Sequence, residues 1–203
     1  MVNEEPVLGR QALKSKLTRE KIIKAVVSLI KEGGFSAAST SRIAERAGMT
    51  WGAAQHHFGS KEEILDAVMT LSHEKFTELM EDKSLRQGSV ADRADQFVDR
   101  MWLHYQDDLY LAALEILLET RGSPERASEP SIFEARSRGH LKTLREIFPE
   151  SKLTDDQMID ALIFVHCFLT GLSIERLFEN QIRHVDVHIR RIKVSLLSLL
   201  SFA

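Results

Sequence analysis

Apolar residues recur at helical spacing along most of the chain. Between Thr18 and Glu32 they fall three and four positions apart, and Gly33-Gly34 closes the segment. Stretches in which β-branched and polar residues alternate, as they do in strands, are nearly absent. Because a spacing of three and four places side chains on one face of an α-helix, the pattern predicts an all-α fold.

Two short helical segments follow this first one. We expect helices over 41–47 and 51–57, with Gly48-Met49-Thr50 as the turn between them. Thr40 and Thr50 are the expected N-caps, because a threonine hydroxyl can accept a hydrogen bond from a free amide of the first turn. After a stop at Gly59, the sequence Ser60-Lys61-Glu62-Glu63 has the pattern of a capping box and predicts the start of a long helix.

Longer helices fill the remainder. Gly88-Ser89 separates the helix opened by Ser60 from the next, and Pro149 ends an amphipathic helix that follows the loop RGSPERASEP. The predicted helices here run through Ile64 to Met80, through Phe97 to Tyr105, from Asp108 to Thr120, up to about Phe148, from Asp155 to about Glu179, and from Val185 to the end.

The helix from Asp155 is apolar around most of its circumference. One apolar face can pack on its own domain, and a second needs another partner, which is usually a second copy of the chain. We therefore expect a homodimer held together by this helix. The candidate dimerisation residues are Ile159, Leu162, Ile163, His166 and Leu169.

Charge is unevenly distributed along the chain. The net charge is −3, but residues 1–61 carry +5 and residues 62–203 carry −8. A basic segment attached to an acidic one indicates that only the N-terminal part meets a polyanion, although a solvated basic tail is the simpler alternative. We place a domain boundary between 1–61 and 62–203.

Composition limits the class of protein. No apolar run reaches the length of a membrane span, and the first residues lack the apolar stretch of a signal peptide. The single cysteine, Cys167, excludes an internal disulfide and a cysteine-based zinc cluster. We therefore expect a cytoplasmic protein.

The two short helices have the composition of a helix-turn-helix. Ala44 and Ala54 are small enough to let them cross closely, and Gly48 can adopt the positive φ of the turn. The outward face of the second helix is then free to enter a major groove. Its residues are Trp51, Gly52, Ala53, Gln55 and His56.

The segment from Thr18 to Met69 also resembles the DNA-binding domain of the TetR family of transcriptional regulators. The resemblance rests on Arg19, Ala25, Gly34-Phe35, Ile43-Ala44, Ala47-Gly48, Gly52, Phe58 and Ser60-Lys61-Glu62. It implies an N-terminal three-helix helix-turn-helix domain followed by a larger helical domain for ligand binding and dimerisation. It further implies a ligand-responsive homodimeric repressor of a palindromic operator, released by a small hydrophobic or aromatic effector.

Contacts with double-stranded DNA follow from this resemblance position by position. It implies backbone contacts from Thr40, Arg42, His57 and Lys61. It implies contacts in the major groove from Thr50, Trp51, Gly52, Ala53, Gln55 and His56. Gln55 stands where many members of the family have a tyrosine; a glutamine can donate to a phosphate or read an adenine edge.

Aromatic and methionine residues mark the candidate effector site on the helices that enclose the ligand in similar proteins. Such residues are also common in a plain core. His73, His104 and Glu115 could add polar contacts. The candidate ligand-binding residues are Phe76, Phe97, Met101, Trp102, Tyr105 and Tyr110.

No motif indicates catalysis, a metal or a cofactor. The sequence SHEKFT begins like a zinc-binding helix but has Thr77 where the second histidine is required. His184 and His188 are four residues apart, yet without a third ligand a solvated helix face is the favoured interpretation. The rival function is a helical small-molecule carrier or adaptor that does not bind DNA sequence-specifically.

Overall fold

The computed structural model describes residues 9–122, 138–179 and 181–201, and all its regular elements in these ranges are helices. This confirms the all-α prediction. The predicted loop RGSPERASEP lies largely outside the described residues, as does the start of the helix that ends near Phe148. The chain divides into two compact units, one formed by 1–72 and 112–119, the other by 73–111 and 120–203.

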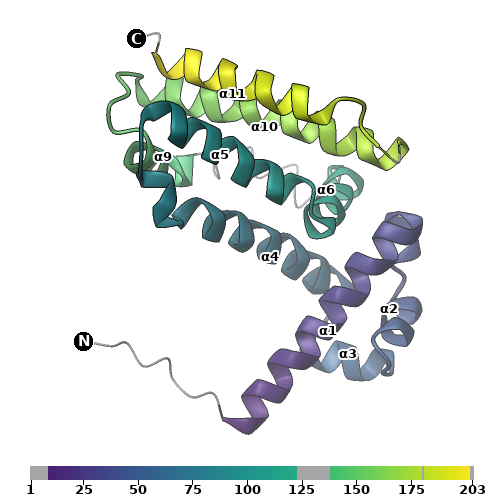
Figure 1. Ribbon diagram of the computed structural model, residues 1–203. Helices are drawn as coiled ribbons and strands as arrows, with labels where there is room; N and C mark the ends of the chain where they lie inside the picture. The colour runs from purple at the N-terminus through teal and green to yellow at the C-terminus, as the bar shows by residue number, and fades with distance from the viewer. Residues whose placement is uncertain (1–8, 123–137, 180, 202–203) are drawn as a thin grey trace. The chain divides into compact units, whose positions relative to one another are not determined.

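The first unit is built on α1, α2 and α3 (Figure 1). Its helices are α1 (Arg10–Gly33), α2 (Thr40–Arg46), α3 (Trp51–Phe58) and the first part of α4 (Lys61–Glu81), with a 3-10 turn η1 (Phe35–Ala37) after α1. Apolar residues spaced three and four apart along α1 form its buried face: Ile22, Ala25, Val26, Leu29 and Ile30. Burial of that stripe against α2 and α3 is what forms the core of this unit.

Helix α1 begins eight residues before the predicted start at Thr18. Arg10, Lys14 and Lys16 lie in its first turns, so this part of the basic segment is helical and not an unstructured tail. Leu13 and Leu17 are 47% and 56% exposed there. This part of the helix buries no apolar face, so the sequence lacks the apolar pattern that would predict it.

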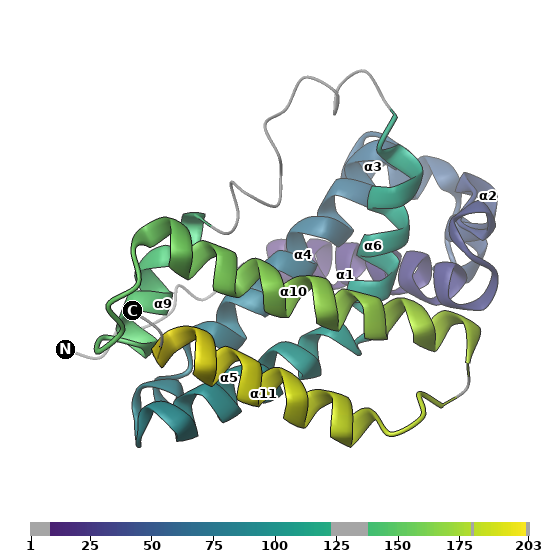
Figure 2. The same ribbon diagram turned by 90° about the horizontal axis from the view of Figure 1, so that it is seen from above.

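The second unit contains the remaining helices around one apolar core. They are the end of α4, the start of α6 (Asp108–Thr120), α5 (Val90–Tyr105), α9 (Leu141–Ile147), α10 (Asp155–Phe178) and α11 (Val185–Ser201), with a 3-10 turn η2 (Lys83–Arg86). Figure 2 shows α10 and α11 side by side, with α5 next to α11. Phe97, Met101, Val165 and Leu169 are among the fully buried residues at the centre.

The compact units do not follow the predicted boundary after Lys61. Helix α4 continues from one unit into the other at Ser72, and residues 112–119 of α6 belong to the first unit. Two helices therefore have residues in both units. Within the described residues, α10 is also the one helix long and apolar enough to cross a membrane, and 44% of its apolar window is buried.

Candidate nucleic-acid interface

Small residues bring α2 and α3 together as predicted. Ala44 and Ala54 are 4% and 0% exposed, and Ala47 between the helices is fully buried. Gly48 has φ of +65°, and its amide donates to the Glu45 carbonyl at 2.9 Å. An L residue with a side chain is strained at this φ, so the glycine is what allows a turn this short.

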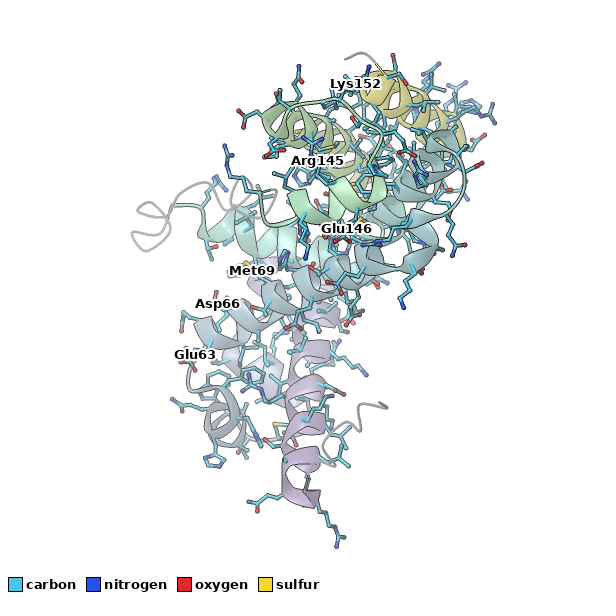
Figure 3. All side chains as sticks on the ribbon, turned by 90° about the vertical axis from the view of Figure 1, so that its left-hand side faces the viewer. Glu63, Asp66, Met69, Arg145, Glu146 and Lys152 are labelled. Carbon is cyan, nitrogen blue, oxygen red and sulfur yellow. The ribbon has the colours of Figure 1, made fainter. Side chains whose placement is uncertain are left out.

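Caps hold the ends of both short helices. The Thr50 hydroxyl accepts a hydrogen bond from the Ala53 amide at 3.2 Å, which confirms the predicted N-cap of α3. The predicted N-cap of α2 was wrong by one residue, because Ser39 accepts from the Arg42 amide and Thr40 is already helical. The start of α4 uses half of the expected capping box: Ser60 accepts from the Glu63 amide at 3.1 Å. Glu63, Asp66 and Met69 then follow one another along α4 (Figure 3).

Helix α3 has one buried and one open face. Ala54 and Phe58 point into the unit, whereas Gly52, Ala53, Gln55 and His56 are exposed and Trp51 is half-buried. A side chain at Gly52 would meet no atom within 4 Å, so the backbone is open to close approach there. The structure therefore brings the predicted groove residues together on one accessible surface, with Thr50 exposed at its start.

The residues expected to contact the DNA backbone differ from one another in exposure and in the groups they contact. Arg42 is exposed on α2, and Thr40 is half-buried beside it. The Lys61 ammonium lies 4.9 Å from the centre of the Phe35 ring, which holds it near the start of α4. His57 is half-buried, and its Nδ1 lies 3.4 Å from the Ser15 hydroxyl.

Contacts from α1 to the end of α3 were missed by sequence reasoning. Arg19 supports the family resemblance, but its partner could not be read from the chain. Its guanidinium donates to the His57 carbonyl at 2.5 Å and stacks 3.8 Å from the centre of the Phe58 ring. His57 and Phe58 lie 38 and 39 residues further along the chain, and an exposed arginine gives no signal of them.

A second missed contact is an ion pair that ties α2 to the end of α1. Arg46 makes two parallel hydrogen bonds of 2.7 Å to the carboxylate of Glu32, and it also donates to the Ser28 hydroxyl. The hydrogen bond from Arg46, with that from Ser28, lowers the pKa of Glu32 to about 2. The paired geometry fixes the direction of α2, although the pair is open to solvent and adds little to stability.

Glu115 belongs to the first unit, whereas the aromatic and methionine candidates for effector binding belong to the second. Its carboxylate accepts a hydrogen bond from the Phe35 amide at 3.0 Å. Burial raises the pKa of Glu115, while the bond from Phe35 opposes that change. The contact attaches α6 to the turn that follows α1.

Three of the candidate effector residues, Phe76, Tyr105 and Tyr110, lie with His104 in an aromatic region of the second unit. The Tyr105 and Tyr110 rings are 4.4 Å apart, and His104 lies 5.3 Å from Phe76 and 5.1 Å from Tyr110, centre to centre. Phe97 instead packs its edge against Phe148 at 5.7 Å. Met101 is buried in the core and Trp102 is half-buried against it.

Hydrogen bonds satisfy the polar groups of this aromatic cluster. The Tyr105 hydroxyl is bonded to Nδ1 of His166, and the Tyr110 hydroxyl lies 2.9 Å from that of Thr170. Burial lowers the pKa of both His104 and His166 to about 4, so both imidazoles are neutral near pH 7. Burial also raises the pKa of Tyr110 to about 12. The cluster therefore offers aromatic faces and uncharged hydrogen-bonding groups.

A narrow space adjoins this aromatic cluster. It is too narrow to admit a water molecule. The residues around it are Phe76, Met80, Phe97, His140, Thr143, Leu144, Ile147 and Leu162.

The candidate dimerisation residues do not form one surface. Ile159, Leu162 and Leu169 are at most 5% exposed and pack in the core of their own unit, so their assignment to an exposed face was wrong. His166 is hydrogen-bonded to Tyr105 of the same chain, and Ile163 is half-buried. Three exposed phenylalanines of α10 lie on another face: Phe164 is 39%, Phe168 38% and Phe178 79% exposed.

Comparison with known proteins accounts for the arrangement of α1 to α4. The family described as bacterial regulatory proteins, tetR family, matches residues 22–68, which include both short helices and the start of α4. The transcriptional regulator CymR of Pseudomonas putida is 22% identical over 86% of this chain and 87% of its own length. A solved tetR-family regulator from Mesorhizobium loti covers 93% of this chain and 97% of its own, with a TM-score of 0.71 and 18% identity.

Residues 22–68 match the tetR family, and regulators and solved structures of that family resemble the chain over most of its length. Short matches to curated regulators have the higher sequence identity, and the matches become less identical as they lengthen. PksA of Bacillus subtilis is 37% identical over 68 residues, and the chain spans 33% of that regulator's length in the match. Proteins of this family are transcriptional regulators and not enzymes, and the all-helical fold of the solved relative extends over both units.

Proposed function

We propose that the chain is a homodimeric repressor that binds a palindromic DNA operator and releases it when a small hydrophobic or aromatic effector binds. The observation that carries this proposal is the exposed face of α3. Thr50 caps that helix, and Ala44, Gly48 and Ala54 fix its crossing with α2, so the face is held rigidly for insertion into a major groove.

The residues of the first unit divide into two groups by the DNA atoms they reach. Arg42, Lys61, Thr40 and His57 supply donors for phosphate oxygens, which positions the helix without reading sequence. The exposed side chain of Gln55 can pair with both N6 and N7 of an adenine, and the methyl of Ala53 suits a thymine methyl. Trp51 and His56 complete the groove face.

The apolar face of α10 supports dimerisation. Phe164 and Phe168 are one turn apart, and Phe178 is the most exposed apolar side chain of the helix. On the neighbouring α11, Val194 is 64% exposed. Burying this face against a second copy removes large apolar surface from water, and a two-fold dimer would present two α3 helices to half-sites about 34–36 Å apart.

The aromatic cluster supports an uncharged effector. Its ring faces favour an aromatic or hydrophobic molecule, and the neutral His104 and His166 can each offer one donor or acceptor. Because the adjoining space does not admit a water molecule, an effector has to separate the side chains around Phe76 on entry. For release, the effector must bind the DNA-incompetent conformation more tightly than the competent one.

A quantitative DNA-binding experiment tests this proposal. We propose that the protein acts in the cytoplasm. In the experiment, the full-length protein is titrated onto duplexes from the region upstream of its own gene at several salt concentrations. We expect affinity to fall steeply with salt, because phosphate contacts release counterions. A flat salt dependence would contradict phosphate binding by the first unit.

Two variants separate the roles of the interface. Lys61→Ala should weaken binding to all duplexes alike and reduce the salt slope by about one unit. Gln55→Ala should change which duplexes are preferred and leave that slope unchanged. If the two variants exchanged these effects, the division between phosphate and base contacts would be wrong.

A further inference from the structure

The last turn of α3 is held from outside by α1. Ser15 and Arg19 are four residues apart on α1 and therefore lie on the same face of that helix. Both contact His57 near the end of α3: Ser15 through its hydroxyl, and Arg19 through its guanidinium. Arg19 is part of the family resemblance, but neither that resemblance nor the proposed function gives Ser15 or Arg19 a role, and the family match over residues 22–68 includes neither of them.

Arg19 stabilises the end of α3 in two ways. The last carbonyls of an α-helix have no partner within the helix and carry partial negative charge, so a cation that donates to one of them is favourable. Arg19 donates to the His57 carbonyl at 2.5 Å, and its guanidinium lies 3.8 Å from the centre of the Phe58 ring. The buried Phe58, 4% exposed, fixes the ring on which the guanidinium rests.

The Ser15 hydroxyl acts on the ring of the same histidine. It lies 3.4 Å from Nδ1 of His57. If the hydroxyl donates, Nδ1 is the acceptor and the imidazole proton must be on Nε2. A neutral histidine in that tautomer has one N–H available, and it can donate to a phosphate oxygen without carrying positive charge.

We propose that Ser15 and Arg19 are positioning residues for DNA binding: Arg19 holds the backbone of His57 at the end of α3, and Ser15 sets the tautomer in which Nε2–H donates to a DNA phosphate. This inference rests on the proposed DNA contact of His57. The first turns of α1 would then contribute to DNA binding by positioning the end of α3. This contribution is separate from any direct attraction between their charges and the DNA.

A double-mutant cycle on the full-length protein tests the role of Ser15. The equilibrium dissociation constant for the preferred duplex is measured for the wild type, Ser15→Ala, His57→Ala and the double variant. Loss of one such hydrogen bond corresponds to a roughly 2- to 10-fold weaker affinity for Ser15→Ala. Because Ser15 acts through His57, it should add nothing further in the His57→Ala background.

Matched variants control for other effects. Thr18→Ala removes a hydroxyl from the same helix, where it bonds only to the Lys14 carbonyl, and should leave affinity within 2-fold. Ser15→Thr keeps the donor and should restore binding. Equal, additive losses from Ser15→Ala with and without His57 would overturn the proposal.

The tautomer of the His57 imidazole can be measured directly. It would not change in Ser15→Ala if Ser15 had a purely structural role. The nitrogen chemical shifts of the His57 ring, measured by NMR with labelled histidine, should indicate protonation at Nε2 in the wild type and a mixture of tautomers in Ser15→Ala. Protonation at Nδ1 in the wild type would overturn the proposal.

Arg19 is tested by its salt dependence. Arg19→Ala should weaken binding while keeping the salt slope, whereas a residue that contacts a phosphate directly would lower the slope by about one unit. Lys24→Ala removes the same charge from an exposed position of α1 and serves as the control. If the wild type shows no sequence-selective binding at all, the proposed function fails; if it binds and the Ser15 and Arg19 variants match their controls, only this inference fails.

Discussion

Acidification should destabilise the second unit through its buried histidines. His104 is 7% exposed, and burial lowers its pKa from 6.5 to about 4 in the folded chain. A group with a lowered pKa in the folded state binds fewer protons there than when unfolded. Its contribution to stability is therefore present above pH 6.5 and is lost as the pH falls towards 4.

The size of this effect follows from the two pKa values. At pH 5 the unfolded imidazole is almost fully protonated and the folded one is almost fully neutral, so His104 costs about 2 kcal/mol of stability relative to pH 7.5. His166 acts in the same direction. The lowered pKa values of Glu32 and Asp82, both about 2, act at lower pH, because those carboxylates stay ionised at pH 5 in both states.

Urea denaturation at pH 7.5 and pH 5 measures the loss. Trp51→Phe leaves Trp102, in the second unit, as the only tryptophan, so its fluorescence reports that unit alone. Adding His104→Gln should reduce the loss of unfolding free energy between the two pH values by about 2 kcal/mol. His56→Gln, which removes an exposed imidazole from α3, is the control and should not reduce it. An equal loss with and without His104 would refute the reasoning.

Three further predictions concern the turn, the cap and the dimer. Gly48→Val forces a β-branched residue to φ of +65° and should lower the unfolding free energy of the first unit by about 1–3 kcal/mol in urea denaturation; an unchanged value would contradict the strain. Thr50→Ala should cost about 1 kcal/mol in the same assay, and Thr50→Ser should restore it; no loss would mean that the cap is not used. Phe168→Glu should give monomers at micromolar concentration by sedimentation, whereas the control Leu103→Glu, also at an exposed apolar position, should leave the dimer intact; a dimer in both would place the interface elsewhere.

Features that depend on neighbouring residues could be predicted from the sequence. The turn at Gly48 and the cap at Thr50 involve partners within four positions, so residue type and spacing are sufficient to place them. The open face of α3 follows from the same local pattern, because Ala54 and Phe58 identify the buried side.

Contacts between distant parts of the chain could not be predicted. The Phe35 amide and the Glu115 carboxylate are 80 residues apart, and neither residue alone indicates the other. The start of α1 was also missed, since its first turns bury no apolar stripe and helical periodicity is a signal of burial.

The dimer face shows a different limit of sequence reasoning. Helix α10 is apolar on most sides, so its pattern cannot distinguish the side that packs on its own unit from the side left for a partner. Ile159 and Leu169 turn inward because α5 and α11 pack against α10. Only the tertiary arrangement leaves Phe164 and Phe168 exposed.

Selection of preferred sites from random DNA duplexes by the full-length protein tests the central claim most directly. If two copies each insert α3 into a major groove, the selected sequences will contain an inverted repeat whose half-sites are about one helical turn, or a whole multiple of it, apart. Recovery of no common sequence, or of a single site without two-fold symmetry, would contradict the account of a homodimer that reads DNA through α3.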